Sequence, residues 1–386
     1  MNCDESSNPA TAFSKDEREI LEKQITCERI EEDVRRYSES LTSRHVGHSQ
    51  NRLAVAQLLI DLYQIGEKGR LWLRPQLFPL FKDQELPQAM NVEAMLSGVK
   101  SSDVVIVSAH LDCTASRDPA YRPKRDPAPG ADDDASGIAG VLAAARAIVQ
   151  LSKIHGRGQP RAEIRFALFN AEELGQRGSR VYTRQEKRRC TSIVAVYQMD
   201  MIGHRRNGGV FEIHAGFKKD AEVQDDSLEL AHHMVEVCAA MESQLIPQVY
   251  FRRGKRRDPA QGFSDHTSFH RRGFPAVLIT ENFFPGPGSV SSPSYPNPDY
   301  HLPEDTLKNL DFQYAADIAR MVAATAWHRA TRINSRPRQA DEQHRDACGG
   351  DMHVQRTAAE EGHEAPLDEG TADSSHSSPG HLVGHG

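Results

Sequence analysis

The chain has 386 residues, enough for two to three small domains or for one large α/β domain with extensions. Its 47 basic and 54 acidic residues give a formal net charge of −7, which argues against a protein that binds nucleic acid along its whole surface. No apolar stretch approaches the roughly 18 residues of a membrane span. Residues 1–5 show neither the basic region nor the apolar region of a signal peptide. We therefore expect a soluble, cytoplasmic protein without nucleic-acid or membrane partners, and of unknown oligomeric state.

The first elements along the chain are predicted to be helices. Residues 15–41 combine many charged side chains with apolar ones at helical spacing, and Ser14 precedes them as a possible N-cap, so we expect an exposed amphipathic helix there. A second helix is expected over residues 50–64, where apolar side chains cover a broad face and Gly66 can end the helix.

From about residue 90 onward, short β-branched runs alternate with helical segments. Strands are expected over residues 103–108, 163–169, 192–197, 210–214 and 276–279. Helices are expected near residues 136–151, 178–189, 226–243 and 311–330. Such alternation is typical of crossover units around a buried sheet. The sequence thus predicts an α/β fold with a mixed, mainly parallel central sheet flanked by helices.

The end of the chain has a different composition. After Trp327 large hydrophobic residues become rare, and the remaining segment is too polar to bury enough apolar surface for folding. Its histidines lack the fixed spacing of a metal site. We predict a helical N-terminal extension over residues 1–43, a main domain over 44–332 and a disordered, His-rich polar tail over 333–386.

The six cysteines lie far apart in the sequence and form no CxxC pair. This spacing suggests neither a thiolate zinc site nor a framework of disulfides. We therefore expect reduced thiols.

Acidic residues and one histidine follow three of the predicted strands or begin the helix between them. They are His110, Asp112, the triplet 132–134, Glu172, Glu173 and Asp200. Each alone has an ordinary structural explanation, such as a strand-end cap or a helix-dipole partner. Because the carboxyl ends of parallel strands share one sheet edge, however, these groups should converge, and so many carboxylates are costly unless cations neutralise them. The pattern favours a site for several metal ions; imidazole and carboxylate ligands suit zinc, with cobalt or manganese possible.

Six blocks of the sequence resemble the co-catalytic dizinc peptidases typified by bacterial leucyl aminopeptidases, which are related to glutamate carboxypeptidase and, more distantly, to glutaminyl cyclases. In family order they are SAHLDC (108–113), PGADDDASGIAGV (129–141), FNAEELGQRGS (169–179), VYQMDMIG (196–203), GFSDHTSFHRRGFPA (262–276) and YHLPEDTL (300–307). Together the blocks are highly specific, and they extend over roughly residues 45 to 330 of the chain.

The resemblance implies a role for each matching residue. His110 and Asp200 correspond to ligands of one zinc ion, Glu173 and His301 to ligands of the other, and Asp133 to the carboxylate that bridges both. Glu172 corresponds to the general base. It would take a proton from the water between the two ions, which leaves a hydroxide, and would then return that proton to the leaving amine. Asp112 is placed to accept the second imidazole N–H of His110.

The resemblance makes residues 44–332 the catalytic domain of a zinc-dependent aminopeptidase acting on peptides with a free N-terminus. Carboxypeptidase or dipeptidase action on acidic peptides is an alternative, favoured only by the basic run at residues 252–257. A glutaminyl cyclase is less well supported because the complete ligand set favours two metal ions. A non-catalytic interaction domain that retains the fold is the alternative from another class.

Substrate contacts are expected where the chain departs from its relatives. The relatives often have an oxyanion-stabilising tyrosine shortly before the SDH motif, whereas residues 258–263 read DPAQGF here. The oxyanion role is therefore expected to fall to Gln261, to another residue or to the metal alone. Apolar walls are expected from Phe263, Phe283, Phe284 and Tyr295. Adjacent residues cannot form a serine triad, so Ser264 of the SDH motif is predicted to be a helix N-cap.

Overall fold

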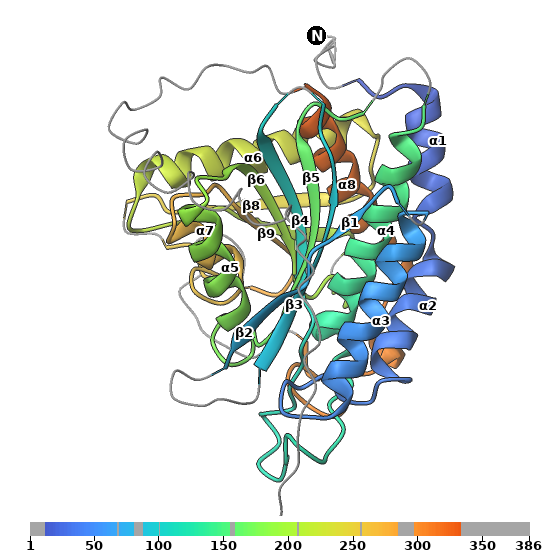
Figure 1. Cartoon of the computed structure of the whole chain (residues 1–386), viewed down its shortest axis with the longest axis vertical. Helices are drawn as coiled ribbons and strands as arrows, with labels where there is room; N and C mark the ends of the chain where they lie inside the picture. The colour runs from blue at the N-terminus through green and yellow to red at the C-terminus, as the bar shows by residue number, and fades with distance from the viewer. Residues whose placement is uncertain are drawn as a thin grey trace, which may run out of the picture. The chain divides into compact units, whose positions relative to one another are not determined.

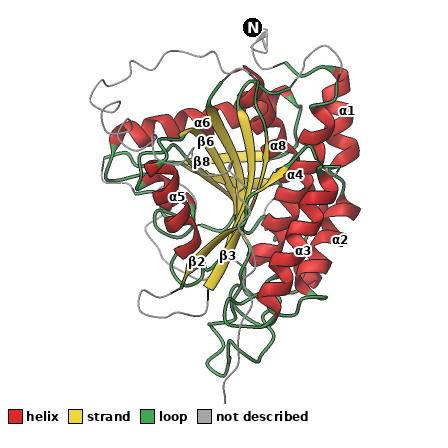
Figure 2. Cartoon of the chain, in the orientation of Figure 1, coloured by secondary structure: helices red, strands yellow, loops and turns green. Residues whose placement is uncertain are grey.

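The computed structural model describes residues 12–67, 69–80, 88–99, 101–154, 159–206, 208–254, 257–284 and 297–332. The predicted polar tail, residues 333–386, lies outside the described residues. Within the described part, strands form one central sheet with helices on both of its faces (Figure 1). The same arrangement, coloured by secondary structure, separates the helices from the sheet that they cover (Figure 2).

The described sheet has nine strands, in the order β1-β3-β5-β4-β6-β9-β7-β8, with β2 paired to β3. The strands are β1 (Trp72–Leu73), β2 (Gln76–Pro79), β3 (Gln88–Leu96), β4 (Asp103–His110), β5 (Glu163–Phe169), β6 (Ser192–Met199), β7 (Val210–His214), β8 (Ile246–Tyr250) and β9 (Val277–Glu281). The central strands β5, β4, β6 and β9 are parallel, whereas β3 and β7 join them antiparallel. The predicted α/β class and mixed sheet with a parallel centre are therefore confirmed.

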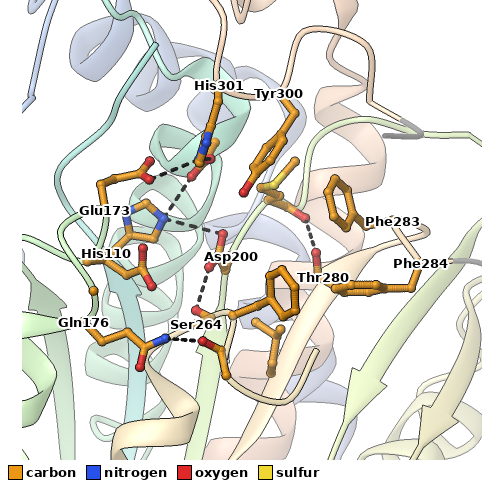
Figure 3. A pocket seen from close by; sticks show the side chains of 17 residues that line it. His110, Glu173, Gln176, Asp200, Ser264, Thr280, Phe283, Phe284, Tyr300 and His301 are labelled. Carbon is orange, nitrogen blue, oxygen red and sulfur yellow. Dashed lines mark hydrogen bonds and ion pairs between the residues drawn. The ribbon is translucent and has the colours of Figure 1, made fainter. Parts of the chain in front are cut away.

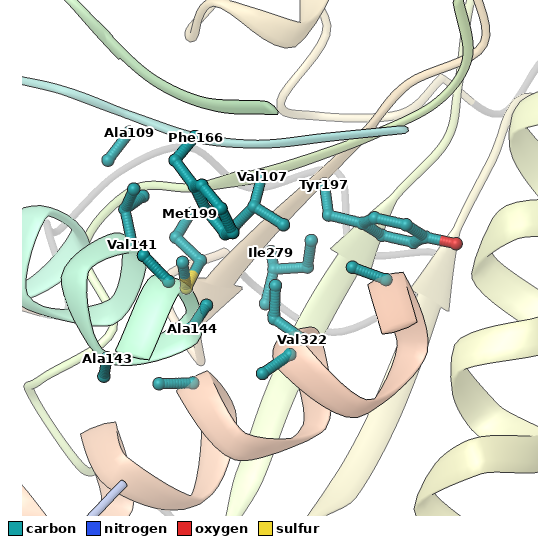
Figure 4. Packing of buried hydrophobic residues seen from close by; sticks show 14 of the residues in the cluster. Val107, Ala109, Val141, Ala143, Ala144, Phe166, Tyr197, Met199, Ile279 and Val322 are labelled. Carbon is teal, nitrogen blue, oxygen red and sulfur yellow. The ribbon is translucent and has the colours of Figure 1, made fainter. Parts of the chain in front are cut away.

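The helices cover the two faces of this sheet. They are α1 (Lys15–Gln24), α2 (Cys27–Ser38), α3 (Gln50–Ile65), α4 (Gly137–Leu151), α5 (Arg177–Arg188), α6 (Ala221–Ala240), α7 (His266–His270) and α8 (Phe312–Arg332). Helices α4 and α8 pack on β4 and β6, while α5 packs on β2 and β3, and α7 on β6. Figure 4 shows Val107 and Phe166 of the sheet facing Val141 of α4 and Val322 of α8, all fully buried. Strand β4 has a continuous apolar run because both of its faces are covered.

The N-terminal segment differs from the single exposed helix that was predicted. It forms two helices, and the chain turns between them at Ile25 and Thr26. Ser14 caps α1 in a capping box with Glu17, as expected. Most of the apolar stripe, including Ile30 and Val34, is fully buried because α1 and α2 pack against α4 and α8. These helices share the main hydrophobic core, and the domain limits drawn from the sequence stay predictions.

The segment Ala131–Leu151, which contains α4, has the length and composition of a membrane-spanning helix. Most of its surface is already buried, because α4 packs against the sheet and α8.

The cysteines follow the expectation in part. Cys27, Cys113 and Cys238 are free thiols. Cys190 is disulfide-bonded, so the prediction of reduced thiols is wrong at this position.

Candidate functional site

Parallel register brings the predicted site residues to one edge of the sheet. His110 is the last residue of β4 and lies opposite Phe169, the last residue of β5. Glu172 and Glu173 follow β5 directly, and Asp200 follows β6, which also runs parallel to β4. The three turns therefore meet beside the turn that contains the aspartate triplet and begins α4.

The middle aspartate of the triplet lies between two imidazoles. Asp133 Oδ1 is 3.0 Å from His110 Nε2, and Asp133 Oδ2 is 3.0 Å from His301 Nε2. Asp200 Oδ1 lies 3.5 Å from His110 Nε2, and Glu173 Oε2 lies 3.1 Å from His301 Nε2 (Figure 3). All five predicted ligands thus come together in two groups that share Asp133.

The donor atoms of these groups suit divalent cations. The buried Glu173 Oε1 has no hydrogen-bond partner, which is unfavourable for a carboxylate unless another group satisfies it. Imidazole nitrogens and carboxylate oxygens are ligands that zinc accepts. No lysine or arginine is among the described residues that line this pocket, so His110 and His301 are the lining side chains there that can carry positive charge.

The acidity of the site residues shows how strongly the carboxylates interact. Burial raises the pKa of Glu172 well above its usual value; Asp265, Glu173 and Asp200 add to the effect, and His110 opposes it. Burial and the charge of Asp133 raise the pKa of Glu173 to about 7.

The same carboxylates favour the charged form of the two imidazoles. Burial alone would lower the pKa of His301, but Glu173 and Asp133 outweigh it and raise the pKa to about 11. Burial likewise opposes the charged form of His110, yet Asp200 and Asp134 raise its pKa well above the usual value. The site therefore favours positive charge between its carboxylates, which is what a bound cation supplies.

The two flanking aspartates of the triplet hold the backbone instead. Asp134 lies near His110 and Asp200, but its Oδ2 accepts from the main-chain N–H of His110 at 3.0 Å. Its Oδ1 accepts from the main-chain N–H groups of Gly137 (2.9 Å) and Met201 (3.2 Å). Asp134 thus fixes the ends of β4 and β6 relative to α4.

Asp132 and Asp305 complete this framework. Asp132 Oδ1 accepts from the Gly203 N–H at 2.8 Å, and its Oδ2 accepts from Asn297 Nδ2 at 2.8 Å. Asp305, four residues after His301, accepts from the main-chain N–H groups of Asp132 (2.9 Å) and Asp133 (3.1 Å). The loop that carries His301 is therefore tied to the triplet.

The predicted role of Asp112 is corrected. His110 Nδ1 contacts the main-chain oxygen of Asp112 at 3.1 Å, whereas the Asp112 carboxylate is 3.7 Å away. That carboxylate accepts from the main-chain N–H groups of Glu172 (2.9 Å) and Glu173 (3.2 Å). The geometry of the turn after β4 places a carbonyl at the ring, which leaves the carboxylate free to hold the Glu172–Glu173 turn.

Ser264 is also corrected. It is not the N-cap of α7, since Asp265 occupies that position, and its hydroxyl donates to Asp200 Oδ2 at 2.6 Å. A ligand oxygen that accepts such a bond is held in one orientation. The serine of the SDH motif therefore orients Asp200, one of the predicted metal ligands.

A pocket of about 250 Å³ opens beside the two ligand groups. Phe263, Phe283 and Phe284 line it, as expected for apolar walls, together with Leu278. Gln261 does not line the pocket, because its side-chain oxygen accepts from the Lys218 N–H at 3.1 Å. The oxyanion role predicted for Gln261 is therefore wrong, and the predicted Tyr295 lies outside the described residues.

Two residues with clear structural roles were not predicted. Tyr300 lines the pocket, and its ring stacks on His301 with centroids 3.8 Å apart (Figure 3). Arg44 is completely buried, and its guanidinium donates to the carbonyls of Leu111 (3.0 Å), Pro129 (2.7 Å) and Gly130 (2.9 Å). Arg44 thus joins the turn after His110 to the turn before Asp133.

The described part of the basic run does not enter the pocket. Arg252, Arg253 and Arg257 are not among the residues that line it. Arg252 instead donates to the Lys218 carbonyl at 3.3 Å and, through its main-chain N–H, to Gln224 Oε1 at 3.1 Å. Lys255 and Arg256 lie outside the described residues.

Known proteins share this fold. The LapA aminopeptidase of Legionella pneumophila superposes with a TM-score of 0.61 at 20% identity, covering 86% of this chain and 79% of that one. BSAP, a zinc aminopeptidase of Bacillus subtilis, superposes with a TM-score of 0.58 at 15% identity, covering 81% of this chain and 96% of that one. At such identities the likeness shows the fold alone.

Sequence comparison adds the family. The probable leucine aminopeptidase of Arthroderma otae is 28% identical over 242 residues, which cover 62% of this chain and 57% of that relative. The chain therefore spans little more than half the length of this curated relative. Residues 91–326, more than half of the chain, match the peptidase family M28 and include all five predicted metal ligands and Glu172. The chain belongs to peptidase family M28.

Proposed function

We propose that the chain is a metal-dependent aminopeptidase, which removes the first residue from peptides with a free N-terminus and uses two zinc ions that cobalt or manganese can replace. The observation that carries this proposal is the Asp133 carboxylate, whose oxygens each lie 3.0 Å from a different imidazole nitrogen, with Glu172 in the same pocket. The leucine aminopeptidase similar to this chain supports the reaction, although the chain spans only part of that relative.

The five predicted ligands would hold the ions. His110 and Asp200 would bind one, Glu173 and His301 the other, and Asp133 would contact both. When bound, the ions would offset the crowded negative charge, polarise the scissile carbonyl and make a coordinated water acidic near neutral pH.

Glu172 is the proton carrier of this proposal. It lines the pocket, while its neighbour Glu173 turns to His301. Asp112 accepts from the main-chain N–H groups of both, which fixes the backbone of the turn that carries the two carboxylates. Glu172 takes a proton from the attacking water and returns it to the leaving amine, the two tasks of a general base and acid.

The polar lining of the pocket suits a substrate amine. It consists of carboxylate, imidazole, hydroxyl and amide groups, without lysine or arginine among the described residues. A protonated α-amine finds partners in such a lining, whereas the C-terminal carboxylate of a substrate does not. This favours an aminopeptidase over the carboxypeptidase or dipeptidase alternative, and the complete ligand set favours an enzyme over an interaction domain.

Tyr300 is positioned to stabilise the oxyanion. Its hydroxyl points into the pocket, beside His301 and above Asp200 (Figure 3). Burial raises the pKa of Tyr300, and the charges of Asp133, Glu173, Asp200 and Glu172 raise it further, so the hydroxyl stays protonated and can donate. A donor aimed at developing negative charge stabilises the transition state more than the bound substrate.

Tyr300→Phe should therefore lower kcat by about 10²-fold and leave KM nearly unchanged. Tyr63→Phe, which alters an exposed ring on α3, is the matched control and should retain the wild-type rate. Steady-state kinetics on an aminoacyl arylamide measures both. An unchanged kcat in Tyr300→Phe would remove the residue from the mechanism.

A panel of aminoacyl arylamides with and without an N-acetyl group tests the proposed function. The protein loaded with zinc should hydrolyse the free amines, lose this activity with a chelator and regain it with zinc. The N-acetylated partners should remain intact because they present no charged amine to the pocket. Preferential hydrolysis of the acetylated substrates, or of peptides from the C-terminus, would contradict an aminopeptidase.

A further inference from the structure

A second buried cluster of ionisable groups lies outside the metal ligands. His214, at the end of β7, has Nδ1 2.7 Å from Asp258 Oδ1 and Nε2 3.0 Å from Glu212 Oε2. The His214 and Glu212 side chains are fully buried, and Asp258 is 3% exposed. The ring also stacks on Tyr250, with centroids 4.5 Å apart and planes 21° apart. We call Glu212, His214 and Asp258 the buried triad.

Each ring nitrogen of His214 faces a carboxylate oxygen, an arrangement that favours a proton on both nitrogens. A neutral imidazole has one N–H and one lone pair, and the lone pair would face a carboxylate oxygen. With both nitrogens protonated, the ring donates to both carboxylates and neutralises part of their charge. The buried ion pair is then fully hydrogen-bonded, as a charge inside a protein must be.

Each carboxylate of the buried triad also holds one apolar wall of the pocket. Glu212 accepts from the main-chain N–H of Phe284, with its two oxygens 3.1 and 3.2 Å away. Asp258 Oδ1 accepts from the Ala260 N–H at 3.0 Å, and the carbonyl of Ala260 accepts from the Phe263 N–H at 3.0 Å.

The rings of these walls contact one another. The Phe284 ring meets His214 edge to face with centroids 5.0 Å apart, and it meets Phe263 at 6.0 Å. The imidazole therefore joins two segments that are distant in the sequence and meet at the pocket mouth.

We propose that the charged imidazole of His214 is a positioning residue, which fixes Phe263 and Phe284 as the wall against which an apolar substrate side chain packs. This inference rests on the proposed aminopeptidase activity. His214 does not touch the reacting atoms: it acts through two carboxylates on two aromatic residues. Losing its charge should therefore weaken binding of large apolar side chains and leave the chemical step unchanged.

The groups around His214 determine its pKa. The described titratable groups that face it are Glu212 on its own strand, Asp258, the Tyr250 hydroxyl, which donates to Glu212 Oε1 at 3.4 Å, and His266 of α7. Burial opposes the charged ring, but Asp258 and Glu212 raise the pKa of His214 to about 9. Burial and the positive charge of His270 and His214 lower the pKa of His266 well below its usual value.

The sign of the pH effect follows from this direction. Because the pKa is raised above its usual value, the ring is charged at neutral pH and loses its proton as the pH rises through about 9. The ratio of KM for a leucyl arylamide to KM for an alanyl arylamide should rise over that interval. Both substrates have the same α-amine, so its own titration cancels in the ratio.

His214→Gln should raise that KM ratio by about tenfold at pH 7, the order of effect of one or two apolar groups in a pocket, with kcat for both substrates within about twofold. His232→Gln, an exposed imidazole on α6, is the matched control and should keep the wild-type ratio. An unchanged ratio in His214→Gln, or a loss of kcat on both substrates, would overturn the proposal. If the variant fails to fold, the pH profile of the wild type decides.

A measurement independent of activity separates this proposal from the proposed function. In ¹⁵N NMR of histidine-labelled protein at pH 7, the signal of a buried histidine with protons on both ring nitrogens should disappear in His214→Gln, whereas the signals of His110 and His301, whose pKa values are also raised, should persist. A neutral ring would refute the charged triad whatever the enzyme does. If the wild type hydrolyses no aminoacyl arylamide, the aminopeptidase assignment fails, and the relative affinities for leucinamide and alaninamide measured by calorimetry replace the KM ratio.

Discussion

Glu172→Gln should lower kcat by about 10²- to 10⁴-fold, the range for loss of a general base, and leave metal binding intact. The amide is close to the carboxylate in size but cannot take a proton. Glu172 is not a member of either ligand group, so its loss should spare both. Removal of one buried carboxylate should also relieve repulsion with Glu173 and Asp200, since both raise the pKa of Glu172.

The measurement combines turnover of an aminoacyl arylamide with zinc analysis of the same sample. Glu304→Gln is the matched control, because it makes the same change at an exposed position three residues after His301. The control should retain wild-type kcat and zinc content. Near-normal turnover of Glu172→Gln at full zinc occupancy would show that another group carries the proton.

Asp133→Asn should reduce zinc affinity by at least about 10²-fold, more than the usual cost of losing a residue that only orients a ligand. The two oxygens of Asp133 face the imidazoles of His110 and His301, and an amide replaces one oxygen by a donor. The single acceptor oxygen that remains in Asp133→Asn cannot contribute to both ligand groups. Activity should fall with the metal content, as measured by calorimetric zinc titration and by hydrolysis of an arylamide.

The neighbouring substitution Asp134→Asn is the informative comparison. Asp134 accepts three main-chain N–H bonds, from His110, Gly137 and Met201, so an amide there turns one acceptor into a clashing donor. We expect a loss of about 1–3 kcal/mol in the free energy of unfolding. Asp133→Asn should instead fold normally without metal. Equal effects of the two substitutions on zinc affinity would contradict the separate roles of the adjacent aspartates.

The convergence of the proposed metal ligands could be predicted because their positions follow strand ends. In a parallel sheet, register alone places His110, the Glu172–Glu173 pair and Asp200 at one edge, and the motif order supplies Asp133 and His301. The central strands could also be predicted from the sequence, since strands that are buried on both faces have continuous β-branched runs. Strand β3, with the sequence QAMNVEAML, has few such residues, and its pairing with β5 decides its conformation.

Contacts that depend on tertiary geometry could not be predicted. Ser264 donates to Asp200, and Arg44 donates to turns of the chain; in both cases the partners lie more than sixty residues apart in the sequence. Tyr300 was overlooked because the comparison with relatives pointed to Gln261, shortly before the SDH motif, whereas Tyr300 lines the pocket from the segment that carries His301. The exposure of the first helix was misjudged because its partners, α4 and α8, come much later in the sequence.

Zinc titration of the metal-free protein by isothermal calorimetry, combined with elemental analysis after dialysis, tests the central claim most directly. The account predicts two zinc ions bound per chain in wild type and a loss of at least one in Asp133→Asn. Wild-type protein that binds no zinc, or binds it with the same stoichiometry and affinity after Asp133→Asn, would contradict it.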